Sequence, residues 1–208
     1  MKQGFTLLEL LITIAILAVL TTVIVVAINP AESIKRARDT QRISDLDNIK
    51  TGIILYISEG YTDIGDGTCK AAILVCKSDV CVGVCGEGES SYDNDGNGWI
   101  PIDFTAMSGG APLSHLPVDP TNSSNNLYGY VANGTDFEIN TRIESVYYSN
   151  SGKNTIMKKD GGNTDLLYEL GTDLTLMDCM IEGADSADCA PGFGVNTTCT
   201  LGKCVPAA

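Results

Sequence analysis

Apolar positions form one long run at the start of the chain. The 24 residues from Phe5 to Ile28 carry a single charge, that of Glu9. As a helix, this run would span about 36 Å at roughly 1.5 Å per residue, enough for a bilayer core of about 30 Å. A secretory signal would have a shorter apolar part that ends at a small-residue cleavage site. The pattern therefore predicts a membrane-spanning helix, in which the unpaired charge of Glu9 needs a partner.

The polar segment that follows, residues 29–59, has apolar side chains at helical spacing. We expect one face to hold Ile34, Ala37, Leu46, Ile49, Ile53 and Tyr56 or Ile57. Its basic and acidic residues balance, and we interpret them as a solvated helix face. Pro30 removes a backbone donor and disfavours helix at Asn29, so a kink or local unwinding is expected there. Gly60 is expected to end the helix.

The remaining residues, 60–208, predict one glycine-rich α+β head rather than two domains. Between Phe137 and Glu144, apolar residues alternate with polar ones, which is typical of a half-buried strand. Asn133-Gly134 is a good hairpin turn in front of it. The predicted strands are Leu127–Ala132, Phe137–Ile143, Ser145–Tyr148 and Leu166–Leu170.

The first residues of the apolar run resemble a known processing site. Gly4-Phe5-Thr6-Leu7-Leu8-Glu9-Leu10 resembles the cleavage motif of type IV pilins and pseudopilins, and the segment 37–49 is also similar to pilin sequences. The resemblance implies a leader over residues 1–4, cleavage by prepilin peptidase between Gly4 and Phe5, and methylation of the new amino terminus. It also implies an α+β fold, in which a long N-terminal helix packs on a small antiparallel sheet with disulfide-closed loops.

The same resemblance implies how the chain is used. Residues 5–28 would anchor the precursor in the cytoplasmic membrane and later form the core of an extracellular pilus, while residues 29–59 pack on the head. The expected partners are other copies of the chain, prepilin peptidase and the inner-membrane assembly machinery. In a dry filament core, the Glu9 carboxylate would pair with the Phe5 ammonium of a neighbour, because either charge alone would be buried without compensation.

The negative charge of the chain argues against nucleic acid as a partner. The chain has a net charge of −13, and residues 60–208 hold 20 acidic and 7 basic residues. Such an acidic surface repels phosphates, so we expect no direct binding of nucleic acid.

The eight cysteines of the chain all lie in the head. An even number behind an exported segment predicts a disulfide framework, although eight cysteines allow 105 connectivities. Pairing within each group of four is favoured by closeness in sequence, and zinc binding is the weaker alternative because no Cys-x-x-Cys occurs. The two groups are Cys69, Cys76, Cys81 and Cys85, then Cys179, Cys189, Cys199 and Cys204.

One loop has the ligand spacing of a calcium site. Asp93-Asn94-Asp95-Gly96-Asn97-Gly98-Trp99 places oxygen side chains at positions one, three and five before a glycine at six, like the first half of an EF-hand loop. The predicted ligands are Asp93, Asp95, Asn97, the Trp99 carbonyl and Asp103. Phe104 stands where the bidentate glutamate belongs, so weak binding is expected. A turn that binds nothing is the alternative.

No catalytic constellation emerges, and we expect no enzyme. No cofactor is required, and Ca²⁺ is the one that the chain could hold. His115, the single histidine, is expected in a loop against the core. The chain is thus predicted to be a structural pilus subunit. The alternatives are a minor pilin or pseudopilin of a type II secretion or DNA-uptake system, and an anchored adhesive head.

Overall fold

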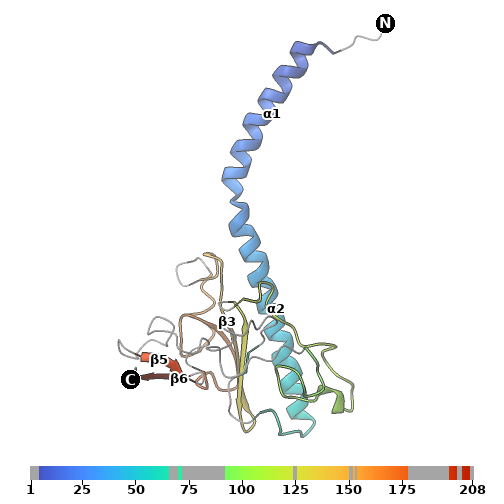
Figure 1. Ribbon diagram of the computed structural model, residues 1–208, viewed down its shortest axis with the longest axis vertical. Coiled ribbons are helices and arrows are strands. Elements are labelled where there is room, and N and C mark those ends of the chain that lie inside the picture. The colour runs from blue at the N-terminus through green and yellow to red at the C-terminus, as the bar shows by residue number, and fades with distance from the viewer. Residues whose placement is uncertain are drawn as a thin grey trace.

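The computed structural model describes residues 5–65, 70–71, 92–123, 126–149, 152, 154–177, 197–200 and 203–206. One long helical rod leads into a head in which a sheet packs beside the second helix (Figure 1). The sheet has the antiparallel strand order β1-β2-β3-β4, and β5 and β6 form a separate hairpin. The elements are α1 Leu7–Ile28, α2 Pro30–Ser58, β1 Lys70–Ala71, the 3-10 helix η1 Phe104–Ala106, β2 Tyr128–Asn133, β3 Asp136–Thr141, β4 Tyr168–Gly171, β5 Thr197–Thr200 and β6 Lys203–Pro206.

The junction between the two helices is a break at a single residue. Asn29 has a left-handed backbone (φ 46°), so it caps the C-terminus of α1 and the N-terminus of α2 together. Its Oδ1 accepts a hydrogen bond from Glu32 N (3.4 Å), and Pro30 takes the first helical position, where no donor is needed. The interruption predicted at Asn29-Pro30 is confirmed.

Within the described part of the chain, no helix combines the length and apolar character needed to cross a bilayer. The segment predicted over Phe5–Ile28 does form a helix, α1, and its crossing of a membrane stays a prediction.

The core lies between α2 and one face of the sheet. The lower half of α2 buries Leu46, Ile49, Ile53 and Tyr56, as predicted, and Gly60 (φ 97°) follows the helix end. The upper half differs: Ile34 is 56% exposed, and Ala37 is exposed too. Polar side chains, Asp39 and Arg42, are buried there instead. The interpretation of the charges as a fully solvated face is therefore wrong for these two residues, because the head covers them.

The hairpin β2–β3 forms close to where the sequence predicts it. Asn133 pairs with Asp136 at its end, so Gly134 and Thr135 make a two-residue loop with Gly134 at φ 67°. The strand predicted at Leu166–Leu170 appears as β4, shifted toward its C-terminus. The strand predicted at Ser145–Tyr148 is wrong, because this segment forms turns against α2.

The sheet is covered on both faces. Phe137 and Ile139 of β3 enter the main core, as the alternation predicts. Glu138 and Asn140, which the same alternation would place in water, are also 0% exposed. The backbone amides of Leu176 and Met177 donate to Glu138, so the end of the segment after β4 lies over this second face.

Candidate functional site

The N-terminal motif forms the first turn of α1. Gly4 lies outside the described residues, and Phe5 precedes the helix with 74% of its surface exposed. Thr6 is the N-cap: its Oγ1 accepts a hydrogen bond from Glu9 N (3.2 Å). The sequence Thr-x-x-Glu has the spacing of a capping box. The processing residue Phe5 and the acid Glu9 are therefore held within one helical turn of each other.

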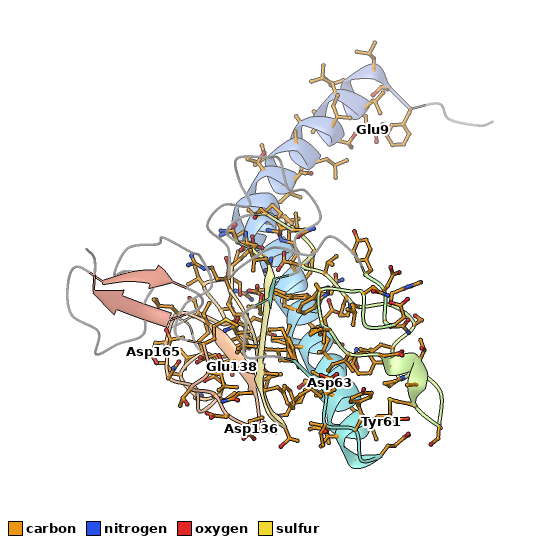
Figure 2. All side chains as sticks on the ribbon, turned by 60° about the horizontal axis from the view of Figure 1, so that its bottom comes forward. Glu9, Tyr61, Asp63, Asp136, Glu138 and Asp165 are labelled. Atoms are coloured by element: carbon orange, nitrogen blue, oxygen red, sulfur yellow. The ribbon has the colours of Figure 1, made fainter. Side chains whose placement is uncertain are left out.

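Glu9 has a local role that sequence analysis did not assign. It is the acidic residue of the first turn of α1, where the helix dipole favours a negative charge. This contribution is worth only about 0.3–1 kcal/mol at an exposed site. It therefore explains why an acid is tolerated here, but it leaves the carboxylate free for a partner outside the subunit (Figure 2).

The apolar side chains of α1 that the structure describes, over residues 7–22 and at Ile24, have no cover within the subunit. Figure 2 shows them projecting from several sides of the rod. Each leucine or isoleucine between Leu7 and Ile24 is about half exposed or more, from Ile12 at 48% to Leu7 at 81%. So large a contiguous apolar surface marks an interaction site. The exposed members are Leu7, Leu8, Leu10, Leu11, Ile12, Ile14, Ile16, Leu17, Val19, Leu20 and Ile24.

A buried ionic cluster, defined here as Asp39, Arg42, Asp119 and Glu144, joins the rod to the head. Arg42 donates from Nε to Asp119 Oδ2 (2.5 Å), from Nη2 to Asp119 Oδ1 (2.9 Å) and from Nη1 to Asp39 Oδ1 (2.7 Å). Asp39 in turn accepts from the backbone amides of Glu144 (3.0 Å) and Ser145 (2.8 Å). Because the buried charges are paired and bonded, the cluster fixes how the head sits on α2.

Glu144 extends the cluster toward the surface. Its Oε2 accepts from Arg38 Nε (2.6 Å) and Arg42 Nη1 (3.1 Å). Burial raises the pKa of Glu144, but the two arginines together outweigh burial, and the pKa is lowered overall. Asp45 lies one turn after Arg42 on α2. Its Oδ2 accepts a hydrogen bond from the hydroxyl of Tyr128 on β2 (2.8 Å), and this bond joins α2 to the sheet. A helical spacing of acids and bases alone does not reveal these partners, because they are distant in sequence.

The predicted calcium loop is a compact turn between Asp93 and Asp103. Asp95 and Asp103 are bridge partners across it, and Gly96 has φ 89°. The side chains of both aspartates are engaged locally: Asp95 Oδ1 accepts from Asn97 N (3.1 Å), and Asp103 Oδ1 accepts from Thr105 N (3.0 Å). In the described residues, no three His, Cys, Asp or Glu side chains gather as a metal ion would require. The calcium assignment stays a prediction.

Trp99 anchors this loop. Its side chain is fully buried and donates from Nε1 to the Pro117 carbonyl (3.2 Å), while Phe104 N donates to Asn94 O (2.8 Å). His115 lies in a neighbouring loop, as predicted, and its side chain is exposed.

Six of the cysteines lie outside the described residues: Cys69, Cys76, Cys81, Cys85, Cys179 and Cys189. The other two, Cys199 on β5 and Cys204 on β6, are direct partners in the register of the terminal hairpin.

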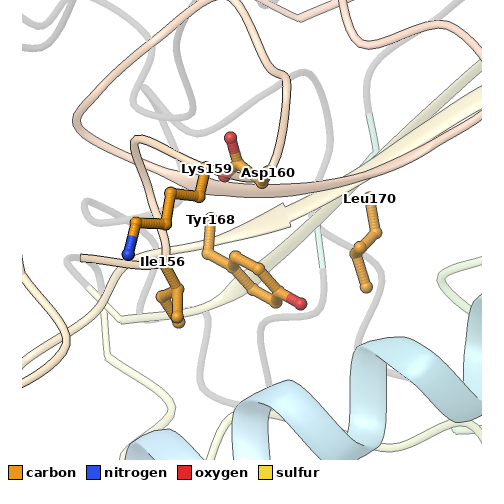
Figure 3. Close-up of a pocket in the computed structure, with 5 residues that line it drawn as sticks. All are labelled: Ile156, Lys159, Asp160, Tyr168 and Leu170. Atoms are coloured by element: carbon orange, nitrogen blue, oxygen red, sulfur yellow. The ribbon is translucent and has the colours of Figure 1, made fainter. Parts of the chain in front are cut away.

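A hollow of about 220 Å³ opens on the head beside β4 (Figure 3). Its lining is mainly apolar, with Ile156, Tyr168 and Leu170, and the Lys159 ammonium and the Tyr168 hydroxyl point in opposite directions in this view. Asp160 is held by the backbone: it accepts from Gly162 N (3.1 Å) and Glu169 N (3.0 Å). The hollow therefore has no convergent polar groups of the kind that define a small-molecule site.

Comparison with known families identifies the N-terminal segment. Residues 1–25 match the family described as the prokaryotic N-terminal methylation motif, the signature of type IV pilins and pseudopilins. A search of curated proteins finds no match, and a search of solved structures finds none.

The motif indicates a precursor of the type IV pilin or pseudopilin kind. It implies processing by a prepilin peptidase and assembly by pilus machinery, with the chain anchored in the membrane first and extracellular afterwards. Proteins that carry this signature are structural rather than enzymatic.

Proposed function

We propose that this protein is a structural subunit of a type IV pilus-like filament, cleaved between Gly4 and Phe5 and polymerised through α1. The observation that carries the proposal is the uncovered apolar surface of α1 directly behind a methylation motif. A helix that is apolar on all sides requires a bilayer or other helices around it. A filament core made of α1 helices from many copies provides that surrounding.

Glu9 sets how neighbouring copies of α1 align along the filament core. Cleavage before Phe5 creates an ammonium group one helical turn from the Glu9 carboxylate. Inside a packed core, each charge would carry a desolvation penalty of several kcal/mol unless it met an opposite charge. Pairing the Phe5 ammonium of one copy with Glu9 of the next satisfies both groups, and it penalises copies that are out of step.

A minor pilin or pseudopilin is the nearest alternative, because the motif is shared by both kinds of protein. A major subunit dominates the material sheared from the cell surface, whereas a minor subunit is scarce there. Quantification of the protein in that fraction separates the two.

The assembly role is tested by comparing Glu9→Ala with Thr13→Ala. Thr13 lies one turn further along α1, is exposed, and bonds only to its own helix (Oγ1 to Leu10 O, 2.8 Å). We expect both variants to accumulate in cells, while Glu9→Ala gives few or no filaments and Thr13→Ala gives normal ones. Normal filaments from Glu9→Ala would contradict the pairing.

A further inference from the structure

Two glutamates lie together on the second face of the sheet. Glu138 on β3 and Glu169 on β4 are each 0% exposed. In the register, Glu169 is opposite Asn140 and Glu138 is opposite Gly171, so the two glutamates are diagonal neighbours on one face. Diagonal positions are within reach of long side chains. Figure 2 shows Glu138 beside β4, within the head.

Glu138 has the surroundings of an ionised carboxylate. Its Oε2 accepts hydrogen bonds from Leu176 N and Met177 N (both 2.9 Å), and its Oε1 accepts one from Asn140 Nδ2 (3.2 Å). Donors that converge on a carboxylate stabilise its charged form. The negative charge of the pair therefore belongs on Glu138.

Glu169 has the surroundings of a neutral acid. Its Oε2 accepts from Thr164 N (3.2 Å), but its buried Oε1 has no hydrogen-bond partner. As a carboxylate, Glu169 would leave that oxygen buried without a donor, which costs free energy. As a protonated acid, Oε1 becomes a donor, and Glu138 is the acceptor beside it.

We propose that Glu138 and Glu169 share one proton, carried by Oε1 of Glu169, and that this pair is a proton-dependent clasp on the head. The clasp acts on the segment around β4: it holds this segment at Thr164, before the strand, and at Leu176 and Met177, after it. Three backbone amides of that segment, those of Thr164, Leu176 and Met177, donate to the two carboxyl groups.

Two other charged groups belong to the elements around the pair. Asp160, in the turn before β4, is half-buried and accepts from Glu169 N, so it adds negative charge near Glu169. Arg142 follows β3 directly and is half-buried. Burial first, and then the charge of Glu138, raise the pKa of Glu169 to about 9.

Because the pKa of Glu169 is raised, the stability of the head should depend on pH. The pKa of Glu169 is higher in the folded protein than in the unfolded chain, so the folded state binds the proton more tightly. Between the ordinary glutamate pKa and the raised value, the stability from this group falls as the pH rises. It is complete below about pH 4.5 and is lost by about pH 9.

The test compares two isosteric variants of the full chain in a mild detergent, by urea unfolding at pH 5, 7 and 9. Glu169→Gln keeps a donor toward Glu138 and removes the titrating group. We expect its urea midpoint at pH 9 to exceed that of the wild type, and its midpoint to change less between pH 5 and pH 9. Glu138→Gln replaces a carboxylate by an amide that cannot accept all three donors, so its midpoint should be lower at every pH.

Asp136→Asn is the matched control, since Asp136 is an exposed acid at the start of the same strand. It should leave the pH dependence of the wild type unchanged. A lower midpoint for Glu169→Gln at pH 9, or equal effects of the two glutamine variants, would overturn the assignment. Stabilisation of the wild type by Ca²⁺ that EDTA reverses and Glu169→Gln abolishes would also overturn it, because a cation would then hold the pair together.

Discussion

Arg42 on α2 and Asp119 in the loop before β2 face each other through two parallel hydrogen bonds, of 2.5 and 2.9 Å. Both side chains are almost completely buried, although the residues are 77 positions apart in the sequence. A bidentate arginine–carboxylate pair fixes orientation as well as distance. Through this pair, α2 is joined to the head in a fixed orientation.

Loss of the Arg42 side chain should damage the fold severely. Arg42→Ala would leave Asp39 and Asp119 buried without their cation, and removal of one partner of a buried pair typically costs about 3–5 kcal/mol. We expect a corresponding loss in the free energy of unfolding, measured by urea titration of the full chain in detergent. Arg36→Ala is the control, because Arg36 is exposed and makes only surface contacts, with Glu32 at 3.6 Å and with the Tyr147 ring at 4.6 Å. Its effect should stay below about 1 kcal/mol, and equal effects of both variants would contradict the role of the cluster.

Acid should loosen the same junction through Glu144. The pKa of Glu144 is lower in the folded protein than its ordinary value, because Arg38 and Arg42 together outweigh the effect of burial. Glu144 therefore contributes stability above the ordinary glutamate pKa, and this contribution is lost as the pH falls through the folded-state value. We expect Glu144→Gln to be less stable than the wild type at pH 7, with the difference shrinking toward pH 3. A constant difference would show that the charge of Glu144 is not responsible.

Gly98 should tolerate no side chain. A Cβ at this position would collide with the Asp93 carbonyl oxygen and with Leu116 Cδ1. Gly98→Ala must therefore open the loop around Trp99, at a cost of about 1–3 kcal/mol. Gly109→Ala has room, since the nearest atom to its Cβ would be Glu59 Oε1 at 3.7 Å. Tryptophan fluorescence should shift for the first variant only, and an unshifted spectrum for Gly98→Ala would contradict the tight packing of the loop.

The disulfide prediction is sharpest in the terminal hairpin. Antiparallel partners such as Cys199 and Cys204 have Cα atoms about 4.5–5.5 Å apart, within the usual disulfide range of about 4.4–6.8 Å. We therefore expect a bond between them. Trypsin cuts after Lys203 and chymotrypsin after Phe193, so peptides 194–203 and 204–208 should stay linked until reduction. Peptide 204–208 attached to any other cysteine, or released before reduction, would rule the bond out.

Local sequence signals predict the helical elements well. The break at Asn29 and the helix end at Gly60 depend on proline and glycine chemistry, which acts within a few residues. The buried face of α2 is predicted correctly where it is apolar, at Leu46, Ile49 and Ile53. The prediction is wrong at Ile34, which is exposed, and at Arg42, which is buried. Arg42 is buried because Asp119 and Glu144 pair with it, and the periodicity of α2 carries no information about such distant partners.

The second face of the sheet is also buried by residues that are distant in sequence. Alternation at Phe137, Glu138, Ile139 and Asn140 correctly predicts a strand and two faces. It cannot predict that the end of the segment after β4 covers the polar face, because that depends on backbone amides rather than on side-chain character. The pairing of Glu169 with Glu138 can therefore be inferred only once the register of β3 and β4 is known.

The mass of the N-terminal peptide shows whether this chain is a processed filament subunit. The protein should be taken from material sheared off the cell surface and analysed by mass spectrometry. We expect a peptide that begins at Phe5 and carries one added methyl group. An intact Met1 terminus, found only in the membrane fraction, would contradict it.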